Sequence, residues 1–124
     1  MSTVLIIEDN EKNMKLARDV LQAKGYKTLE AVTGEEGVQL AKQHVPDLVL
    51  MDIQLPGING IEAFRQIRAD AKTAKVAVVA LTASVTPTDR SAITAAGFDA
   101  FISKPINLKE FLETVKRLAD GAKK

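Results

Sequence analysis

Short apolar runs alternate along the chain with longer stretches in which apolar residues recur at helical spacing. Five runs have the composition of β-strands: TVLII (3–7), KTLEAV (27–32), DLVLM (47–51), VAVVAL (76–81) and AFI (100–102). Between residues 10 and 24, the apolar positions are Met14, Ala17, Val20 and Leu21. Between residues 107 and 119, they are Leu108, Phe111, Leu112, Val115 and Leu118. This spacing predicts helices that each bury one face.

Polar and small residues mark where the predicted helices begin and end. The start signals are the pairs Thr33–Glu36 and Asn107–Glu110, with capping-box spacing, and Thr86 before Pro87, a residue suited to the first helical position. Gly25 and Gly97 predict helix ends. The chain therefore follows a βαβαβαβαβα pattern.

This pattern predicts an α/β fold, a doubly wound five-stranded parallel sheet with helices on both faces. Three runs, 3–7, 47–51 and 76–81, are almost continuously apolar, as expected of strands covered on both faces. Residues 27–32 alternate and indicate an edge strand, which favours the flavodoxin-like order 2-1-3-4-5. We expect one domain over residues 1–118 and a flexible tail over 119–124.

Composition narrows the possible chemistry of this 124-residue chain. Its 17 basic and 16 acidic residues are spread evenly, with a formal net charge of +1, so neither nucleic acid nor a membrane is an expected partner. It has no cysteine and one histidine, which disfavours disulfides, thiolate chemistry and a histidine-rich metal site. Without a signal sequence or an apolar run long enough to span a membrane, a cytoplasmic location is the default expectation.

Polar residues follow the predicted strands where a ligand site is expected, at the carboxyl edge of the sheet. Glu8 and Asp9 end the first strand, Asp52 the third and Thr82 the fourth, and Lys104 follows the fifth. The first and third strands would be neighbours, so three like-charged carboxylates should crowd together and favour a bound cation. An oxygen-only site with few carboxylates suits magnesium, which readily shares its coordination shell with a phosphate.

The sequence lacks the glycine-rich nucleotide motifs G-x-G-x-x-G and G-x-x-x-x-G-K-[ST], so ATP or NAD binding is not expected. A carboxylate such as Asp52 can instead act as a nucleophile and form an aspartyl phosphate. Phosphoryl transfer depends mainly on positioning and charge neutralisation. A magnesium ion, an ammonium group and a hydroxyl around Asp52 would provide both.

Four segments together resemble the receiver domain of two-component response regulators over nearly the whole chain: EDN (8–10), MDIQLPGINGIE (51–62), LTAS (81–84) and FISKP (101–105). Each segment alone is weak, but their combined spacing is specific. The stretch IEDNEKNMKL also resembles small division-control receivers and the receivers of hybrid histidine kinases.

The resemblance implies a magnesium site in which Asp9 and Asp52 bind the ion together with the main-chain carbonyl of Gln54. Glu8 would act mostly through a metal-bound water. The acidic pair is Glu-Asp where the family usually has Asp-Asp, so the distance from Glu8 to the metal is open. Gln54 and Ser84 occupy positions that vary in the family and tune the phosphoryl lifetime.

The resemblance also implies a phosphorylation switch. Asp52 would accept a phosphoryl group from a histidine kinase or a histidine phosphotransfer protein, with Lys104 and Thr82 contacting the phosphoryl oxygens. Phe101 occupies the aromatic switch position, and Pro105 is expected to follow a cis peptide bond. Phosphorylation would change the surface of the fourth helix, the fifth strand and the fifth helix for a downstream protein. The chain would be a signalling protein, monomeric or weakly dimeric, that assists only its own phosphorylation and dephosphorylation.

Other readings of these residues remain open. Asp52 could begin a turn, Glu8 and Asp9 could favour a helix start, and Phe101 could be ordinary core. A phosphatase of the haloacid dehalogenase type also uses an aspartate nucleophile, but Gln54 replaces its second aspartate. A pseudo-receiver that is never phosphorylated, or a receiver cut from a longer regulator, would carry the same segments. His44 is expected to be a surface residue without a function.

Overall fold

The computed structural model describes residues 2–53, 55, 57–82, 87–103 and 106–120. Its strands are β1 (Thr3–Ile7), β2 (Lys27–Ala31), β3 (Leu48–Asp52), β4 (Ala77–Thr82) and β5 (Ala100–Ser103). Its α-helices are α1 (Glu11–Ala23), α2 (Gly34–His44), α3 (Gly60–Ala69), α4 (Pro87–Ala96) and α5 (Leu108–Val115), and α5 continues into a π-helical turn, η1 (Lys116–Asp120). The predicted alternation of strands and helices is confirmed.

The strands form one parallel sheet in the order β2-β1-β3-β4-β5, as predicted. The central strands β1, β3 and β4 are buried almost along their whole length, whereas β2 is an edge strand with exposed positions. Because helices cover both faces of the sheet, almost every side chain of a central strand is buried, which explains why these strands are continuous apolar runs.

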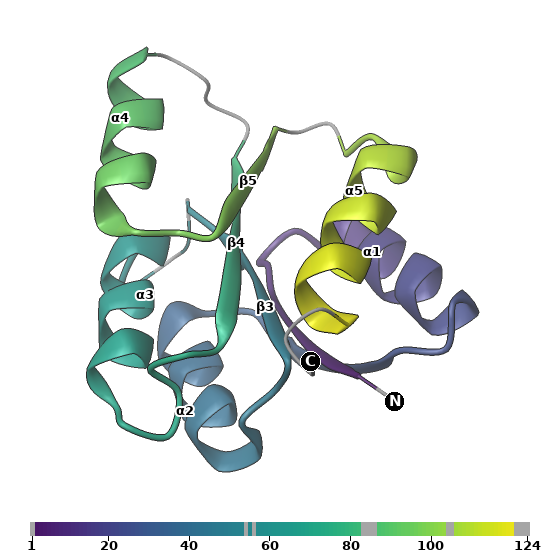
Figure 1. Ribbon diagram of the computed structural model, residues 1–124, viewed down its shortest axis with the longest axis horizontal. Coiled ribbons are helices and arrows are strands. Elements are labelled where there is room, and N and C mark those ends of the chain that lie inside the picture. Colours follow the sequence, from purple (N-terminus) through teal and green to yellow (C-terminus); the bar gives the residue numbers. More distant parts are fainter. Residues whose placement is uncertain (1, 54, 56, 83–86, 104–105, 121–124) are drawn as a thin grey trace.

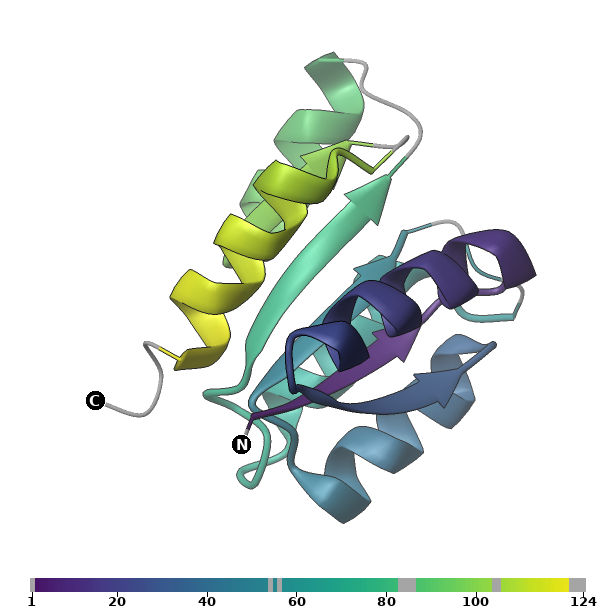
Figure 2. The ribbon, with the colours of Figure 1, turned by 90° about the vertical axis from the view of Figure 1, so that its right-hand side faces the viewer.

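The helices form two layers, with α1 and α5 on one face of the sheet and α2, α3 and α4 on the other (Figures 1 and 2). Successive strand residues point to opposite faces. In β1, Val4 and Ile6 therefore pack with α1 and α5, while Leu5 and Ile7 pack with α2 and α3. All four are fully buried, and each such side chain contributes about 1.5–3 kcal/mol to folding.

Short polar side chains begin the helices that lead away from the carboxyl edge of the sheet. Thr33 and Asn107 cap α2 and α5 as predicted, each accepting a hydrogen bond at 3.1 Å from the backbone N–H three residues later. Asn10 and Asn59 cap α1 and α3 in the same way. Gly97 ends α4 with a φ of +100°, a conformation that glycine adopts without strain.

The strand bounds differ in detail from the predicted runs. Strands β3 and β4 are as long as the runs 47–51 and 76–81 but begin and end one residue later, with Asp52 and Thr82 as the last residues that pair with neighbouring strands. In α4, among residues 91–96, whose side chains the structure describes, Ala92 is exposed, Ile93 is buried and Ala96 is partly buried. Ala119, in the turn η1, is fully buried and belongs to the core cluster on the α1 and α5 face, and the domain boundary at residue 118 stays a prediction. Among the described residues, no helix combines the length and apolar character needed to cross a membrane.

Candidate functional site

The ends of β1 and β3 bring three carboxylates together. Ile7 is the register partner of Met51, so Glu8, which follows β1 directly, and Asp52, the last residue of β3, lie side by side at the carboxyl edge. Asp9 follows Glu8 directly. One carboxylate oxygen from each of the three residues lies within 4.8 Å of the others. The predicted convergence of Glu8, Asp9 and Asp52 is therefore present.

The three carboxylates differ strongly in exposure. Glu8 and Asp52 are only 1% and 4% exposed, whereas Asp9 is exposed to solvent. The backbone N–H of Glu8 donates to the Ala31 carbonyl at 3.0 Å, which continues the pairing of β1 with β2. The Glu8 carboxylate accepts the backbone N–H of Asn10 at 3.3 Å. The start of α1 thus orients Glu8, and its dipole favours negative charge there.

The cluster fits the ligand preference of a small divalent cation. All three side chains offer oxygen, the donor that magnesium prefers, and the exposed Asp9 leaves a route to solvent for the waters that magnesium retains. Bringing three negative groups this close costs free energy through repulsion, and a bound cation would offset that cost. The described part of the site can therefore hold a metal ion.

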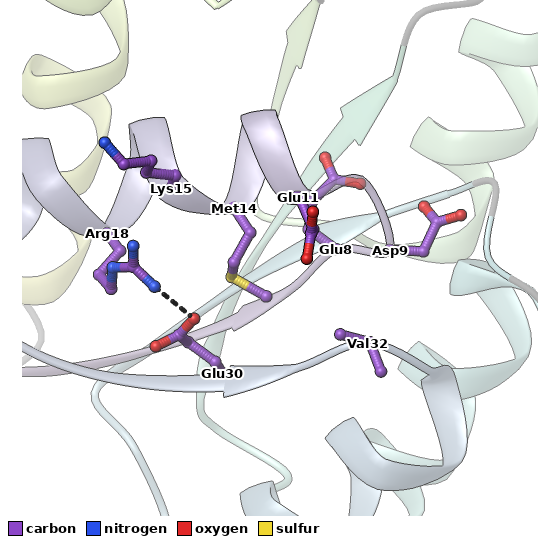
Figure 3. A pocket seen from close by; sticks show the side chains of 8 residues that line it. All are labelled: Glu8, Asp9, Glu11, Met14, Lys15, Arg18, Glu30 and Val32. Carbon is purple, nitrogen blue, oxygen red and sulfur yellow. Dashed lines mark hydrogen bonds and ion pairs between the residues drawn. The ribbon is translucent and has the colours of Figure 1, made fainter.

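A groove of about 410 Å³ opens onto Glu8 and Asp9, as Figure 3 shows. It runs between α1 and β2, and its lining residues are Glu8, Asp9, Glu11, Met14, Lys15, Arg18, Glu30 and Val32. An ion pair of 3.1 Å between Arg18 and Glu30 joins the two sides of the groove at the end away from Glu8 and Asp9. The acidic cluster is thus reached from an open surface.

Thr82 and Phe101 lie on the two strands next to this cluster. Thr82 is the last residue of β4, is 2% exposed, and follows Leu81, the register partner of Asp52. Phe101 is partly buried on β5, where it pairs in register with Ala80. Gln54, Ser84, Lys104 and Pro105 lie outside the described residues, so the roles expected of them remain predictions.

One residue of the site was missed by the sequence analysis. Gly60, the first residue of α3, packs against the main chain of Asp52 and Ile53. The segment NGIE (59–62) has the same capping-box spacing as the predicted helix starts. That signal could have placed the start of α3 at Gly60, but not its contact with Asp52.

Comparison with known proteins agrees with this geometry. The family model of the response regulator receiver domain matches residues 4–116. The polar-differentiation response regulator DivK of Brucella ovis is 45% identical over 114 residues, which are 92% of this chain and 93% of that protein.

Two solved structures show the same fold over nearly the whole chain. The receiver domain of a sensor histidine kinase from Pseudomonas aeruginosa, which has a magnesium ion coordinated in its active-site cleft, is 30% identical with a TM-score of 0.90, covering 96% of this chain and 98% of that one. The receiver domain of a signal transduction histidine kinase from Syntrophus aciditrophicus is 28% identical with a TM-score of 0.92, covering 100% and 94%. From the family match, the fold and the carboxylate cluster, we conclude that the chain belongs to the response regulator receiver domains of two-component signalling.

Proposed function

We propose that this receiver domain switches when Asp52 accepts a phosphoryl group from a phosphohistidine. A carboxylate oxygen of Asp52 would bond to phosphorus as the phosphorus–nitrogen bond breaks, and the released imidazole would take up a proton from water. The donor would be a histidine kinase or a histidine phosphotransfer protein, since receivers of this family interact with histidine kinases and downstream targets. The single observation that carries the proposal is the position of Asp52, buried at the end of β3 beside two other carboxylates.

Asp9 and Asp52 would hold a magnesium ion together with the main-chain carbonyl of Gln54, and Glu8 would bind one of the waters of that ion. Magnesium in this place would neutralise charge on the phosphoryl oxygens and on the carboxylates. Two observations support this: the carboxylate oxygens lie within 4.8 Å of one another, and the related Pseudomonas receiver contains magnesium in its cleft.

The remaining residues would stabilise the phosphorylated form. The hydroxyl of Thr82 would donate a hydrogen bond to a phosphoryl oxygen, and the ammonium group of Lys104 would pair with another. The same groups would help Asp52 to gain and lose its phosphoryl group, so the only reaction that the chain assists is its own. The output would be a changed surface on α4, β5 and α5 that binds a downstream protein.

The proposal is tested by incubating the purified chain with magnesium and acetyl phosphate and measuring its intact mass. We expect the mass to rise by one phosphoryl group. The variant Asp52→Asn should show no rise, because an amide cannot act as the acceptor. Asp19→Asn is the matched control, since Asp19 is an exposed aspartate on α1 whose side chain is 54% exposed and which should not be phosphorylated.

Undiminished labelling of Asp52→Asn would show that another residue is the acceptor. Failure of the parent chain to gain mass from acetyl phosphate or from a panel of phosphorylated histidine kinases would favour a pseudo-receiver. Transfer from only one kinase of the panel would identify the donor.

A further inference from the structure

Gly60 touches the peptide that follows the proposed phosphoacceptor. A β-carbon built on Gly60 would lie 2.7 Å from the Ile53 Cα and closer still to the carbonyl oxygen of Asp52. These are main-chain atoms of the site, so no side-chain rotation could relieve the overlap. The first turn of α3 therefore approaches Asp52 as closely as it does only because residue 60 has no side chain.

Hydrogen bonds hold the main chain of Ile53, the residue after Asp52, through both its N–H and its carbonyl group. The backbone N–H of Ile53 donates to the Leu81 carbonyl at 3.0 Å, and the backbone N–H of Gly60 donates to the Ile53 carbonyl at 3.0 Å. The main chain after Asp52 is thus held between β4 and the start of α3. Asn59, which caps α3, accepts the backbone N–H of Glu62 at 2.9 Å and fixes that helix start.

We infer that Gly60 is a positioning residue for phosphorylation: it lets the capped start of α3 hold the main chain of Asp52 so that its carboxylate meets those of Glu8 and Asp9. This inference rests on the proposed function of Asp52. Because Asp52 comes from the end of β3 whereas Glu8 and Asp9 come from the segment after β1, a small shift of the β3 end would separate the metal ligands. Misplacing a reacting group by about 1 Å can reduce a rate by about 100-fold.

Gly37 provides a matched control. A β-carbon on Gly37 would lie 2.7 Å from the Ile7 Cγ1, so it is as crowded as Gly60, but its neighbours are side-chain atoms in the layer between α2 and β1. A side chain there disturbs packing without pressing on the main chain of Asp52. Gly37→Ala and Gly60→Ala should both lower the melting temperature, and only Gly60→Ala should disable the site.

The test compares the two variants at a temperature at which circular dichroism shows both to be folded. We expect Gly60→Ala to be phosphorylated by acetyl phosphate roughly tenfold or more slowly than the parent at saturating magnesium and donor, and Gly37→Ala to stay within about twofold. Gly60→Ala should also lose most of the rise in melting temperature that magnesium gives the parent. Equal rates and equal magnesium effects in the two variants would overturn the inference.

The magnesium effect separates this inference from the proposed function. If the parent were not phosphorylated, the role of Asp52 would fail, but loss of the magnesium effect in Gly60→Ala alone would still support positioning. If Gly60→Ala did not fold, a second pair of variants would test the inference. Asn59→Ala removes the cap of α3, and Thr33→Ala removes the cap of α2 as its matched control. Only Asn59→Ala should slow phosphorylation, by about threefold or more, and equal slowing by both would overturn the inference.

Discussion

The two edges of the sheet use carboxylates in opposite ways. At the carboxyl edge, Glu8, Asp9 and Asp52 bring like charges within 4.8 Å of one another. At the amino edge, Asp47 and Asp99 each accept a backbone N–H from a neighbouring strand, from Thr3 and Val78 respectively, both at 2.8 Å. At the carboxyl edge the carboxylates repel one another, whereas at the amino edge each carboxylate accepts a hydrogen bond that joins two strands.

The amino edge also joins α3 to the turn between α4 and β5. Arg68 donates to Asp99 at 2.9 Å and lies over the ring of Phe64, with 4.9 Å between its guanidinium carbon and the ring centroid. Phe64 stacks on Phe98 with 4.2 Å between ring centroids. The ion pair is partly exposed, so most of the stabilisation should come from the aromatic contact and from satisfying the buried N–H of Val78.

This difference separates stability from function within one small domain. Crowded carboxylates cost folding free energy, and they persist where a cation and a phosphoryl group are expected to bind. The amino edge lies at the far end of the strands and can be optimised for stability alone. Substitutions at the two edges should therefore have opposite effects on stability and different effects on magnesium binding.

The largest effect is expected at the amino edge. Asp99→Ala would leave the buried N–H of Val78 without its acceptor and remove the partner of Arg68. We expect the free energy of unfolding to fall by about 2 kcal/mol, measured by urea denaturation, with the magnesium effect unchanged. The control is Asp19→Ala, which removes an exposed carboxylate on α1 and should change the free energy of unfolding by less than about 0.5 kcal/mol. Equal losses in the two variants would contradict the role given to the amino edge.

Magnesium should stabilise the parent chain, because the unfolded chain has no preformed site. At a magnesium concentration ten times the dissociation constant, the gain is about 1.4 kcal/mol. It is measured as the difference between denaturation curves in magnesium and in chelator, with ionic strength matched by sodium chloride. Asp9→Asn removes one proposed ligand and should abolish most of the gain. A melting temperature that millimolar magnesium leaves unchanged would argue against the metal site.

A slightly smaller effect is expected from the two ends of β3. Asp52→Asn relieves repulsion at the carboxyl edge and should raise the free energy of unfolding in metal-free buffer by about 1 kcal/mol. Asp47→Asn weakens the hydrogen bond from Thr3 at the start of the same segment and should lower it by up to about 1 kcal/mol. If both variants changed the free energy of unfolding in the same direction, the proposed difference between the two edges of the sheet would be wrong.

The sequence could predict the strand order and the carboxylate cluster because both follow from short-range patterns. Continuous apolar runs identify the central strands, and parallel strands bring their carboxyl ends to one edge, so Glu8, Asp9 and Asp52 had to meet. The exact strand bounds were predicted less well: β3 and β4 begin and end one residue later than the apolar runs 47–51 and 76–81, because the polar residues Asp52 and Thr82 still pair with neighbouring strands.

Contacts between distant segments could not be predicted in this way. Arg68 and Asp99 are 31 residues apart, and no periodicity relates them. The sequence likewise does not show which alanines of α4 face the core: Ala92 is exposed, whereas Ala96 packs against the core. The contact of Gly60 with the main chain of Asp52 could not be predicted either, because a sequence does not show what occupies the space beside a glycine.

The smallest change in stability is expected at Thr82, where the effect should appear in signalling. By strand register, Thr82 pairs with Ser103, and Phe101 lies two residues earlier on β5. Side chains two apart share a face of the sheet, so Thr82 and Phe101 are diagonal neighbours on the face covered by α3 and α4. A phosphoryl group on Asp52 would draw the Thr82 hydroxyl toward it and free space into which Phe101 could turn.

The variant Thr82→Ala should therefore be phosphorylated on Asp52 without switching fully. The helix α4 is a suitable movable element, because among its residues 91–96, whose side chains the structure describes, only Ile93 is buried and Ala96 is partly buried. Phosphorylation can shift its position only through contacts that differ between the two states, and the Thr82 hydroxyl would provide one of them. We expect the amide chemical-shift and hydrogen-exchange changes of α4 and β5 on phosphorylation to be clearly smaller in Thr82→Ala than in the parent, with equal phosphorylation shown by intact mass.

The control is Thr28→Ala, on the edge strand β2, which should respond like the parent. If Thr82→Ala switched α4 and β5 as fully as the parent, the coupling from Thr82 to Phe101 would be wrong, and the signal would have to leave the carboxyl edge by another route.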